Sequence, residues 1–324
     1  MNWLTLTIIS YLLLAFVNLG DKFVMDKILG DSRVYAFTVA ILSLIVVIIA
    51  PWFLKWPGLF LFLINILAGT FFIFALWTMY EALKKGEASR VVVVIGSIVP
   101  IFTLFFSLIL FKENFTLNQW FGMFFLLAGM LQMSLIVSRR TKWSTFTKRT
   151  LSVFSGKYKK KWIFLSILSA FLYAVFFIST KYAYSQQEFL SAFIWTRLGG
   201  LLPAALFLID KSSRKIILES FKPKKKRPRL LRLRKEKKPR KFLVILNQGL
   251  GSLAALLQNY AIYLGPVAII NALQGIQYAF LLLLGIFFSF FFPKILKEDI
   301  SKKVLIKKST AIVLVGIGLY LILK

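Results

Sequence analysis

The chain has 324 residues and carries 42 lysines and arginines against 12 aspartates and glutamates, a formal net charge of +30. It is nevertheless 59% hydrophobic and 16% aromatic, with a mean hydropathy of +0.78. A soluble nucleic-acid binder of this charge would be far more polar, so the composition excludes that class. It favours an integral membrane protein in which charged and apolar residues are segregated along the chain.

The sequence contains no cysteine and no histidine. Disulfides and thiolate chemistry are therefore excluded, and the commonest metal ligand and general base is missing. There is also no Gly-rich phosphate loop of the Walker type and no buried carboxylate pair. We therefore expect no enzyme, no metal and no cofactor. Concentrative transport would have to draw on an ion gradient or on solute exchange.

Ten apolar stretches are each about 20 residues long, enough to cross about 30 Å of hydrocarbon as a helix. They cover residues 3–20, 34–54, 58–79, 89–111, 117–137, 162–184, 189–209, 242–264, 266–292 and 304–323. These runs are too long and continuous for barrel strands, and the first lacks the basic n-region of a signal peptide. The sequence therefore predicts an all-α integral membrane protein with ten transmembrane helices and no separate soluble domain.

Basic residues gather in alternate connectors. Connectors after odd-numbered spans hold 37 of the 42, including nine in 138–161, 16 in 210–241 and six in 293–308. By the positive-inside rule these connectors lie in the cytoplasm and both chain ends lie outside. We expect the protein in the plasma membrane.

The strongest basic run extends from Lys222 to Lys241, and its three prolines argue against one continuous helix. Three interpretations are open. A solvated loop that fixes the topology is favoured, contact with anionic membrane lipids at the basic loops is second, and nucleic-acid contact is the least favoured.

Residues 1–137 and 162–324 each contain five spans, joined by a basic linker at 138–161. Laying one over the other matches Ser10 with Ser169, Ala15 with Ala174, and Gly129 with Gly316. Because five is odd, the second copy would be inverted in the membrane. Inverted repeats are an architecture of transporters, with the substrate site near the midplane between the halves.

The segment from Tyr80 to Met130 carries a specific pattern. An Ala-Leu pair and a Gly precede the fourth span, and four further residues follow at Pro100, Glu113, Gly122 and Gly129. This segment resembles the EamA-like transporters of the drug/metabolite transporter superfamily. The resemblance implies ten helices, alternating access, and a central cavity formed mostly by helices 3, 4, 8 and 9.

The second half resembles the family more weakly and departs from it at one position. It repeats Ala261, Gly265, Gly275, Glu298 and Gly316, but Ala279 stands where Pro100 would map. Ten-helix relatives usually have cytoplasmic termini, which disagrees with the distribution of charge. We follow the charge distribution, because it is a property of this chain.

Apart from Arg90, Lys307 and Lys308, which lie near the starts of their spans and are counted with the connectors, two basic residues lie inside predicted spans, where an ionisable group needs a partner or a function. Arg197 lies eight residues into the seventh span, about 12 Å deep. It could clamp a carboxylate or phosphate, or hydrogen-bond to a neighbouring helix. Lys181 could contact substrate or extend to the interface. No carboxylate lies in the middle of a span, which favours anionic or zwitterionic solutes over lipophilic cations.

Neutral polar residues concentrate in the eighth and ninth spans. Their spacing puts each set on one helix face, as a cavity wall or as contacts between helices. The sets are Gln248, Ser252 and Asn259, and Asn271, Gln274 and Tyr278.

Three residues of the first half complete the candidates. Trp77 could line the cavity, although aromatic residues are frequent enough here that core or belt placement is the default. Pro100 would serve as a gating bend or as a static kink. Glu81 is expected to pair with Lys85, four residues on.

We therefore predict a secondary transporter, an exporter or exchanger, of small polar anionic or zwitterionic metabolites by alternating access. One alternative is a flippase for a lipid-linked carrier, which would need an opening toward the bilayer. The other is a membrane scaffold with a basic cytoplasmic loop, which would lack a polar cavity.

Overall fold

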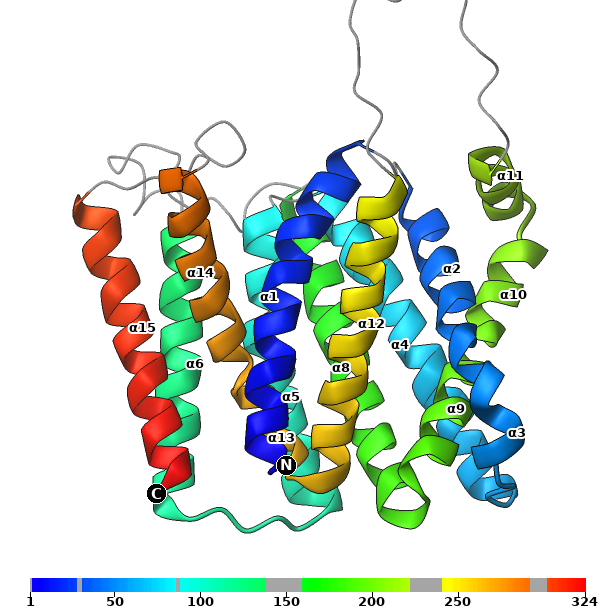
Figure 1. The fold of residues 1–324 in the computed structure, drawn as a ribbon, viewed down its shortest axis with the longest axis horizontal. Coiled ribbons are helices and arrows are strands. Elements are labelled where there is room, and N and C mark those ends of the chain that lie inside the picture. The colour runs from blue at the N-terminus through cyan, green and yellow to red at the C-terminus, as the bar shows by residue number, and fades with distance from the viewer. Residues whose placement is uncertain (1, 28–30, 86–87, 138–158, 222–240, 292–301) are drawn as a thin grey trace, which may run out of the picture.

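Figure 1 shows the fold in the computed structural model, which describes all residues except 1, 28–30, 86–87, 138–158, 222–240 and 292–301. The basic run from Lys222 therefore lies outside the described residues up to position 240. No strand occurs in the described part of the chain. The helices are α1 (Trp3–Lys27), α2 (Ser32–Ser43), η1 (Leu44–Ile49), α3 (Ala50–Phe53), α4 (Leu59–Lys85), α5 (Ala88–Leu110), α6 (Leu117–Val137), α8 (Lys159–Gln186), α9 (Phe189–Gly199), α10 (Leu201–Ile209), α11 (Lys211–Phe221), α12 (Lys241–Leu264), α13 (Val267–Ala272), α14 (Gln274–Phe291) and α15 (Lys302–Leu323).

The fold is that of an all-helical membrane protein, and each predicted span falls on helical structure. Among the described residues, five helical segments are long and apolar enough to cross a membrane: Ser32–Phe53, Leu59–Lys85, Lys161–Gln186, Phe189–Ile209 and Val267–Leu284. Shorter apolar helices cover Trp3–Asn18, Val94–Leu110 and Ser309–Leu323. The membrane class predicted from composition is thereby supported, while the number of ten crossings stays a prediction.

The seventh predicted span is broken between α9 and α10. Pro203 has no backbone N–H, so the carbonyl oxygen of Gly199 loses its helical partner four residues on. The hydroxyl of Thr70, on α4, lies 3.2 Å from that oxygen and shares its proton between it and the Ile66 carbonyl oxygen, at 2.8 Å on its own helix. A buried carbonyl must find a partner in a membrane protein, and a neighbouring helix supplies it here.

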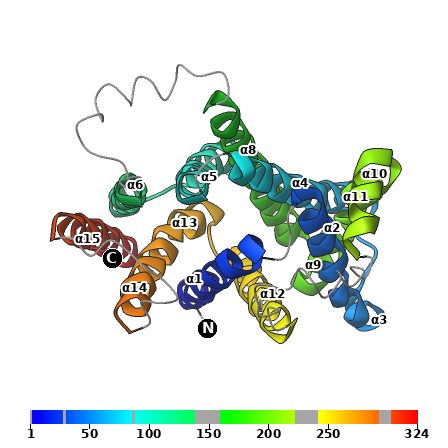
Figure 2. The ribbon, with the colours of Figure 1, turned by 90° about the horizontal axis from the view of Figure 1, so that it is seen from above.

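The bundle is elongated, and different helices form its two ends (Figure 2). Figure 2 shows α6 and α15 at one end, α2, α9, α10 and α11 at the other, and α1, α4, α5, α8 and α12 between them. The chain starts and ends at the same face of the bundle (Figure 1). The helices α4 and α8 pack most extensively, followed by α6 with α15 and α1 with α12.

Small residues let α6 and α15 approach closely. A methyl group on Gly122 would lie 2.9 Å from the carbonyl oxygen of Gly318, and one on Gly129 would lie 3.0 Å from that of Ala311. Such seams permit backbone contact between membrane helices. Gly316, which the overlay matched with Gly129, has open space beside it, so Gly318 is the glycine of α15 in this seam.

Candidate functional site

Arg197 is held by a close crossing of α9 over α4. A methyl group on Gly69 would lie 1.9 Å from the carbonyl oxygen of Thr196, and one on Gly199 would lie 2.4 Å from that of Ile66. Only glycine fits at these two positions, because backbone from the other helix fills the space of a side chain. The crossing therefore places Arg197 directly against α4.

Hydrogen bonds fix the same crossing. The hydroxyl of Thr196 shares its proton between the Ala192 carbonyl oxygen, at 2.8 Å on its own helix, and Asn65 Oδ1, at 3.2 Å on α4. Asn65 Nδ2 donates to Gln187 Oε1 at 3.3 Å. These contacts join α4 to α9 and to the end of α8. The helix that carries Arg197 is thus fixed by polar contacts as well as by packing.

The Arg197 side chain is buried, with 8% of its surface exposed. Its guanidinium carbon lies over two aromatic rings, 4.5 Å from the centre of Phe193 and 5.1 Å from that of Phe72. These cation–π contacts partly offset the cost of burial. The guanidinium makes no hydrogen bond or ion pair to any residue that the structure describes.

Tyr184 and Asn259 lie near this cation. Tyr184 is on α8, within electrostatic range of Arg197, and its hydroxyl donates to Asn259 Oδ1 on α12 at 3.1 Å. The Asn259 Nδ2 donates to the carbonyl oxygen of Ala255 at 2.8 Å. The Asn259 amide is therefore engaged between helices, which favours the interhelical interpretation of this residue.

The predicted polar face of α12 divides by burial. Gln248 is half-buried, and its Nε2 lies 3.4 Å from the hydroxyl of Tyr35 on α2. Ser252 is exposed and donates to the Gln248 carbonyl oxygen at 2.9 Å, whereas Asn259 is buried. The three residues differ too much in environment to form a uniform wall.

The predicted face of the ninth span meets a break in the helix between α13 and α14. Asn271 is 1% exposed, and its Nδ2 lacks a partner in the described structure. Gln274 starts α14 and is half-buried. Tyr278 is buried and donates to the carbonyl oxygen of Val92, on α5, at 3.1 Å. Gln277 was not predicted, yet it is buried with an unpartnered Oε1.

Tyr11 is a second residue that the sequence did not single out. It is fully buried on α1, donates to the Ile270 carbonyl oxygen at 2.8 Å, and lies 3.4 Å from Gln258 Nε2. It thereby joins α1, α12 and α13 next to the break. Its only signal in the sequence is a hydroxyl inside an apolar span, and that signal does not identify its partners.

Trp77 lies on α4 with its ring packed against Phe74 and Phe207. Its Nε1 is enclosed and has no partner among the described residues. Core packing accounts for the ring, while the indole N–H is left as an unused donor.

Pro100 is buried inside α5, and the Thr103 hydroxyl donates to the Pro100 carbonyl oxygen at 3.0 Å.

Lys181 caps the end of α12. Its ammonium donates to the carbonyl oxygens of Gly265 at 2.7 Å, Ile262 at 2.9 Å and Tyr263 at 3.4 Å. Carbonyls at a helix C-terminus lack intrahelical partners and carry partial negative charge, so a lysine from another helix is a good cap. These contacts favour a structural role, because all three donors of Lys181 are used.

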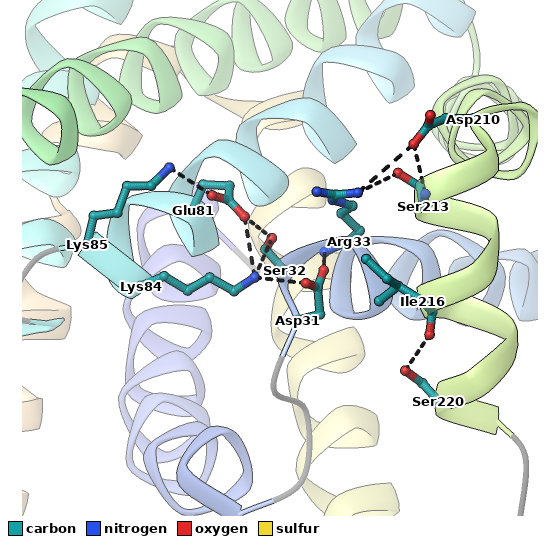
Figure 3. Close-up of polar contacts among 10 residues, drawn as sticks. All are labelled: Asp31, Ser32, Arg33, Glu81, Lys84, Lys85, Asp210, Ser213, Ile216 and Ser220. Carbon is teal, nitrogen blue, oxygen red and sulfur yellow. Dashed lines mark hydrogen bonds and ion pairs between the residues drawn. The ribbon is translucent and has the colours of Figure 1, made fainter.

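Figure 3 shows a charged network where α2, α4 and α11 meet. Lys85 Nζ lies 3.0 Å from Glu81 Oε2, which confirms the predicted pair. Lys84 Nζ donates to Asp31 Oδ2 and to Ser32 Oγ, both at 3.2 Å, and Ser32 donates to Glu81. The network therefore ties the start of α2 to the end of α4.

Comparison with known proteins gives one family and one fold. Residues 1–135 match the model of the EamA-like transporter family, which confirms the resemblance seen between Tyr80 and Met130. No curated protein matches the chain. A solved structure described as "Crystal structure of protein" is 13% identical and superposes with a TM-score of 0.62 over 98% of this chain and 95% of that chain. At this identity the likeness concerns the fold alone.

Proposed function

We propose that this chain, whose residues 1–135 match the model of the EamA-like transporter family, is a secondary transporter of small metabolites that carry a carboxylate or phosphate. Arg197 is the residue that binds the anionic group. The solute moves by alternating access between two inverted five-helix repeats, residues 1–137 and 162–324.

One observation carries the proposal: a buried guanidinium over two aromatic rings, without an anionic partner in the described structure. Ionisable groups inside a membrane are expensive and are kept where they serve a ligand or a pathway. A guanidinium presents a planar fork of donors that matches a carboxylate or phosphate with two hydrogen bonds. A substrate anion would thus offset the cost of burying Arg197.

Unused hydrogen-bonding groups support a polar remainder of the substrate. Asn271 and Gln277 each have one unpartnered polar atom, at the break between α13 and α14. Gln274 lies between them and makes no hydrogen bond to another described residue. Broken membrane helices commonly form substrate sites. We place the substrate's polar groups here, with Tyr278 and Gln248 at its margin.

The packing supports inverted repeats. The contact of α4 with α8 corresponds, in the other repeat, to the contact of α12 with α1. In the same way, the contact of α5 with α8 corresponds to that of α14 with α1. If Gly129 of the first repeat corresponds to Gly318 of the second, then Gly122 corresponds to Ala311. The two contacts across the seam of α6 and α15, Gly122–Gly318 and Gly129–Ala311, are then related to each other by the repeat. A two-fold relation in the membrane plane explains both patterns.

The test is transport by the purified protein in liposomes. Solutes are offered as matched pairs, each acid with its uncharged amide, so that only the carboxylate differs. We expect the acid to be moved in preference by about tenfold or more, the value of a charge-assisted hydrogen-bond pair. Arg197→Gln should abolish that preference, and Lys181→Gln should keep it. Equal fluxes of acid and amide, or a preference that survives Arg197→Gln, would remove Arg197 from the site.

The same liposomes separate the rival functions. A flippase would expose a fluorescent lipid-linked phosphate to a dye-quenching reagent on the opposite leaflet, without flux of water-soluble acids. A scaffold would give no flux of either kind.

A further inference from the structure

Helix α11 is amphipathic and is anchored to the bundle by one side. Ile217 and Ser213 are buried there, and Ile217 packs in a cluster with Val34 and Tyr35 of α2. Arg33 Nη1, at the start of α2, donates to Ser213 Oγ at 3.0 Å (Figure 3). The position of α11 is therefore fixed, and its other side is presented outward.

The outward side carries a cationic hollow. Lys211, Arg214 and Lys215 are exposed and line it together with Leu218 and Glu219, around a volume of about 260 Å³. Residues spaced by three and four positions lie on one helix face, so the three cations converge. Leu218, at 52% exposure, adds an apolar contact beside them.

The hollow lies at the level where the apolar surface of the bundle ends. Helix α10 exposes Leu202, Leu206 and Ile209, which suit contact with lipid chains. Asp210 follows immediately, and α11 begins one residue later. Figures 1 and 2 place α11 at the edge of the bundle, at the face opposite the two chain ends. This is where a phospholipid headgroup would meet the protein.

We propose that the outer face of α11 binds the headgroup of an anionic phospholipid of the surrounding leaflet. The phosphate lies among Lys211, Arg214 and Lys215, since clustered basic side chains recognise phosphate by charge-assisted hydrogen bonds. Glu219 confines the anion to the first two turns. The acyl chains run past Leu218 toward the apolar side of α10. The proposal requires membrane insertion but no particular transported solute.

A fluorophore on α11 of the full-length protein tests this. The wild type has no cysteine, so Ser220→Cys can be labelled uniquely, and Ser220 lies outside the hollow. The protein is placed in phosphatidylcholine vesicles that contain either brominated phosphatidylglycerol or brominated phosphatidylcholine at the same mole fraction. We expect the anionic lipid to quench at least about twofold more, because each basic residue at an anionic surface strengthens attraction about fivefold.

Two matched triple variants separate this site from the general charge of the chain. Lys211→Gln/Arg214→Gln/Lys215→Gln should bring the quenching ratio to one. Lys159→Gln/Lys160→Gln/Lys161→Gln removes as much charge at the start of α8 and should leave the ratio unchanged. The conservative Lys211→Arg/Lys215→Arg variant should also keep it. Elution as one species in gel filtration confirms folding of each variant.

Three outcomes would overturn the proposal. Equal quenching by both lipids in the parent would show no preference for the anionic headgroup. An equal loss in the α8 variant would assign the effect to bulk charge. Binding of a short RNA to vesicles of phosphatidylcholine alone, lost in the α11 variant, would make nucleic acid the occupant. Added glycerol phosphate should not reduce the quenching, because the free anion lacks the membrane contacts.

Discussion

Thr70 shares its hydroxyl proton between the carbonyl oxygen of Ile66, at 2.8 Å on its own helix, and that of Gly199, at 3.2 Å, the oxygen that Pro203 leaves without a helical partner. The longer bond spans two helices and lies two residues from Arg197 along α9. The bend after the cation is thus satisfied by α4, which also supplies the Phe72 ring over the guanidinium.

The Thr70–Gly199 bond predicts a coupling between Thr70 and Pro203. Thr70→Val should lower the free energy of unfolding by about 1–3 kcal/mol, because it leaves a buried carbonyl unpaired. In a Pro203→Ala background the restored N–H can bond to Gly199, so the same substitution should cost less. Thermal unfolding in detergent of the wild type, both single variants and the double variant measures the difference. Additive effects would contradict the proposed exchange of partners.

The crossing of α4 and α9 predicts a strong effect of one methyl group. Gly69→Ala places carbon 1.9 Å from the Thr196 carbonyl oxygen, where only movement of the backbone can relieve the clash. We expect a loss of about 1–3 kcal/mol, as for overpacking in a core, with reduced transport because Arg197 shifts. Gly316→Ala is the control, since its added methyl group meets open space. Similar melting temperatures for the two variants would contradict the crossing.

The sequence predicts local features well and distant partners poorly. The ten helical stretches and the Glu81–Lys85 pair follow from apolar length and helical spacing, which neighbouring residues determine. Tyr11 and Ile270 are 259 positions apart, so periodicity alone cannot bring them together. The overlay of the two halves matched Gly129 with Gly316, whereas Gly318 lies in the seam. A shift of two residues changes the quality of an alignment little, but it moves the glycine to a different face of the helix.

Lys181 is predicted to stabilise the protein without selecting the substrate. Lys181→Gln should lower the melting temperature, because three carbonyl oxygens lose a charged donor at the end of α12. Lys181→Arg should recover part of the loss. The KM for the transported solute should stay within about twofold of wild type. A large rise in KM at unchanged stability would instead make Lys181 a substrate ligand.

The start of α11 is predicted to loosen in acid. Hydrogen bonds from the Ser213 side chain and backbone hold the pKa of Asp210 below its usual value. Because the pKa of Asp210 is lowered in the folded protein, its carboxylate stabilises the start of α11 fully above the ordinary pKa of about 3.9. This stabilisation is lost as the pH falls through the pKa of Asp210 in the folded protein. A nitroxide at Ser220→Cys, in vesicles of zwitterionic lipid, should therefore keep constant mobility from pH 8 to about pH 5 and gain mobility only as the pH falls below the ordinary carboxyl pKa of about 3.9. Asp210→Ala should show high mobility at every pH. A mobility change near pH 6 would require another titrating group.

The last prediction concerns orientation, where the charge distribution and the habit of the family disagree. The chain ends lie at one face of the bundle and α11 lies at the opposite face (Figure 1). Because 37 of the 42 basic residues fall in connectors after odd-numbered spans, we expect that second face in the cytoplasm. In intact cells a membrane-impermeant maleimide should label Asn2→Cys and Lys324→Cys, and should reach Ser220→Cys only after permeabilisation. Unequal labelling at Asn2 and Lys324 would rule out an even number of crossings. Labelling of Ser220 alone would keep the fold and reverse the orientation, which would mean that the basic loops of this chain face outward despite their charge.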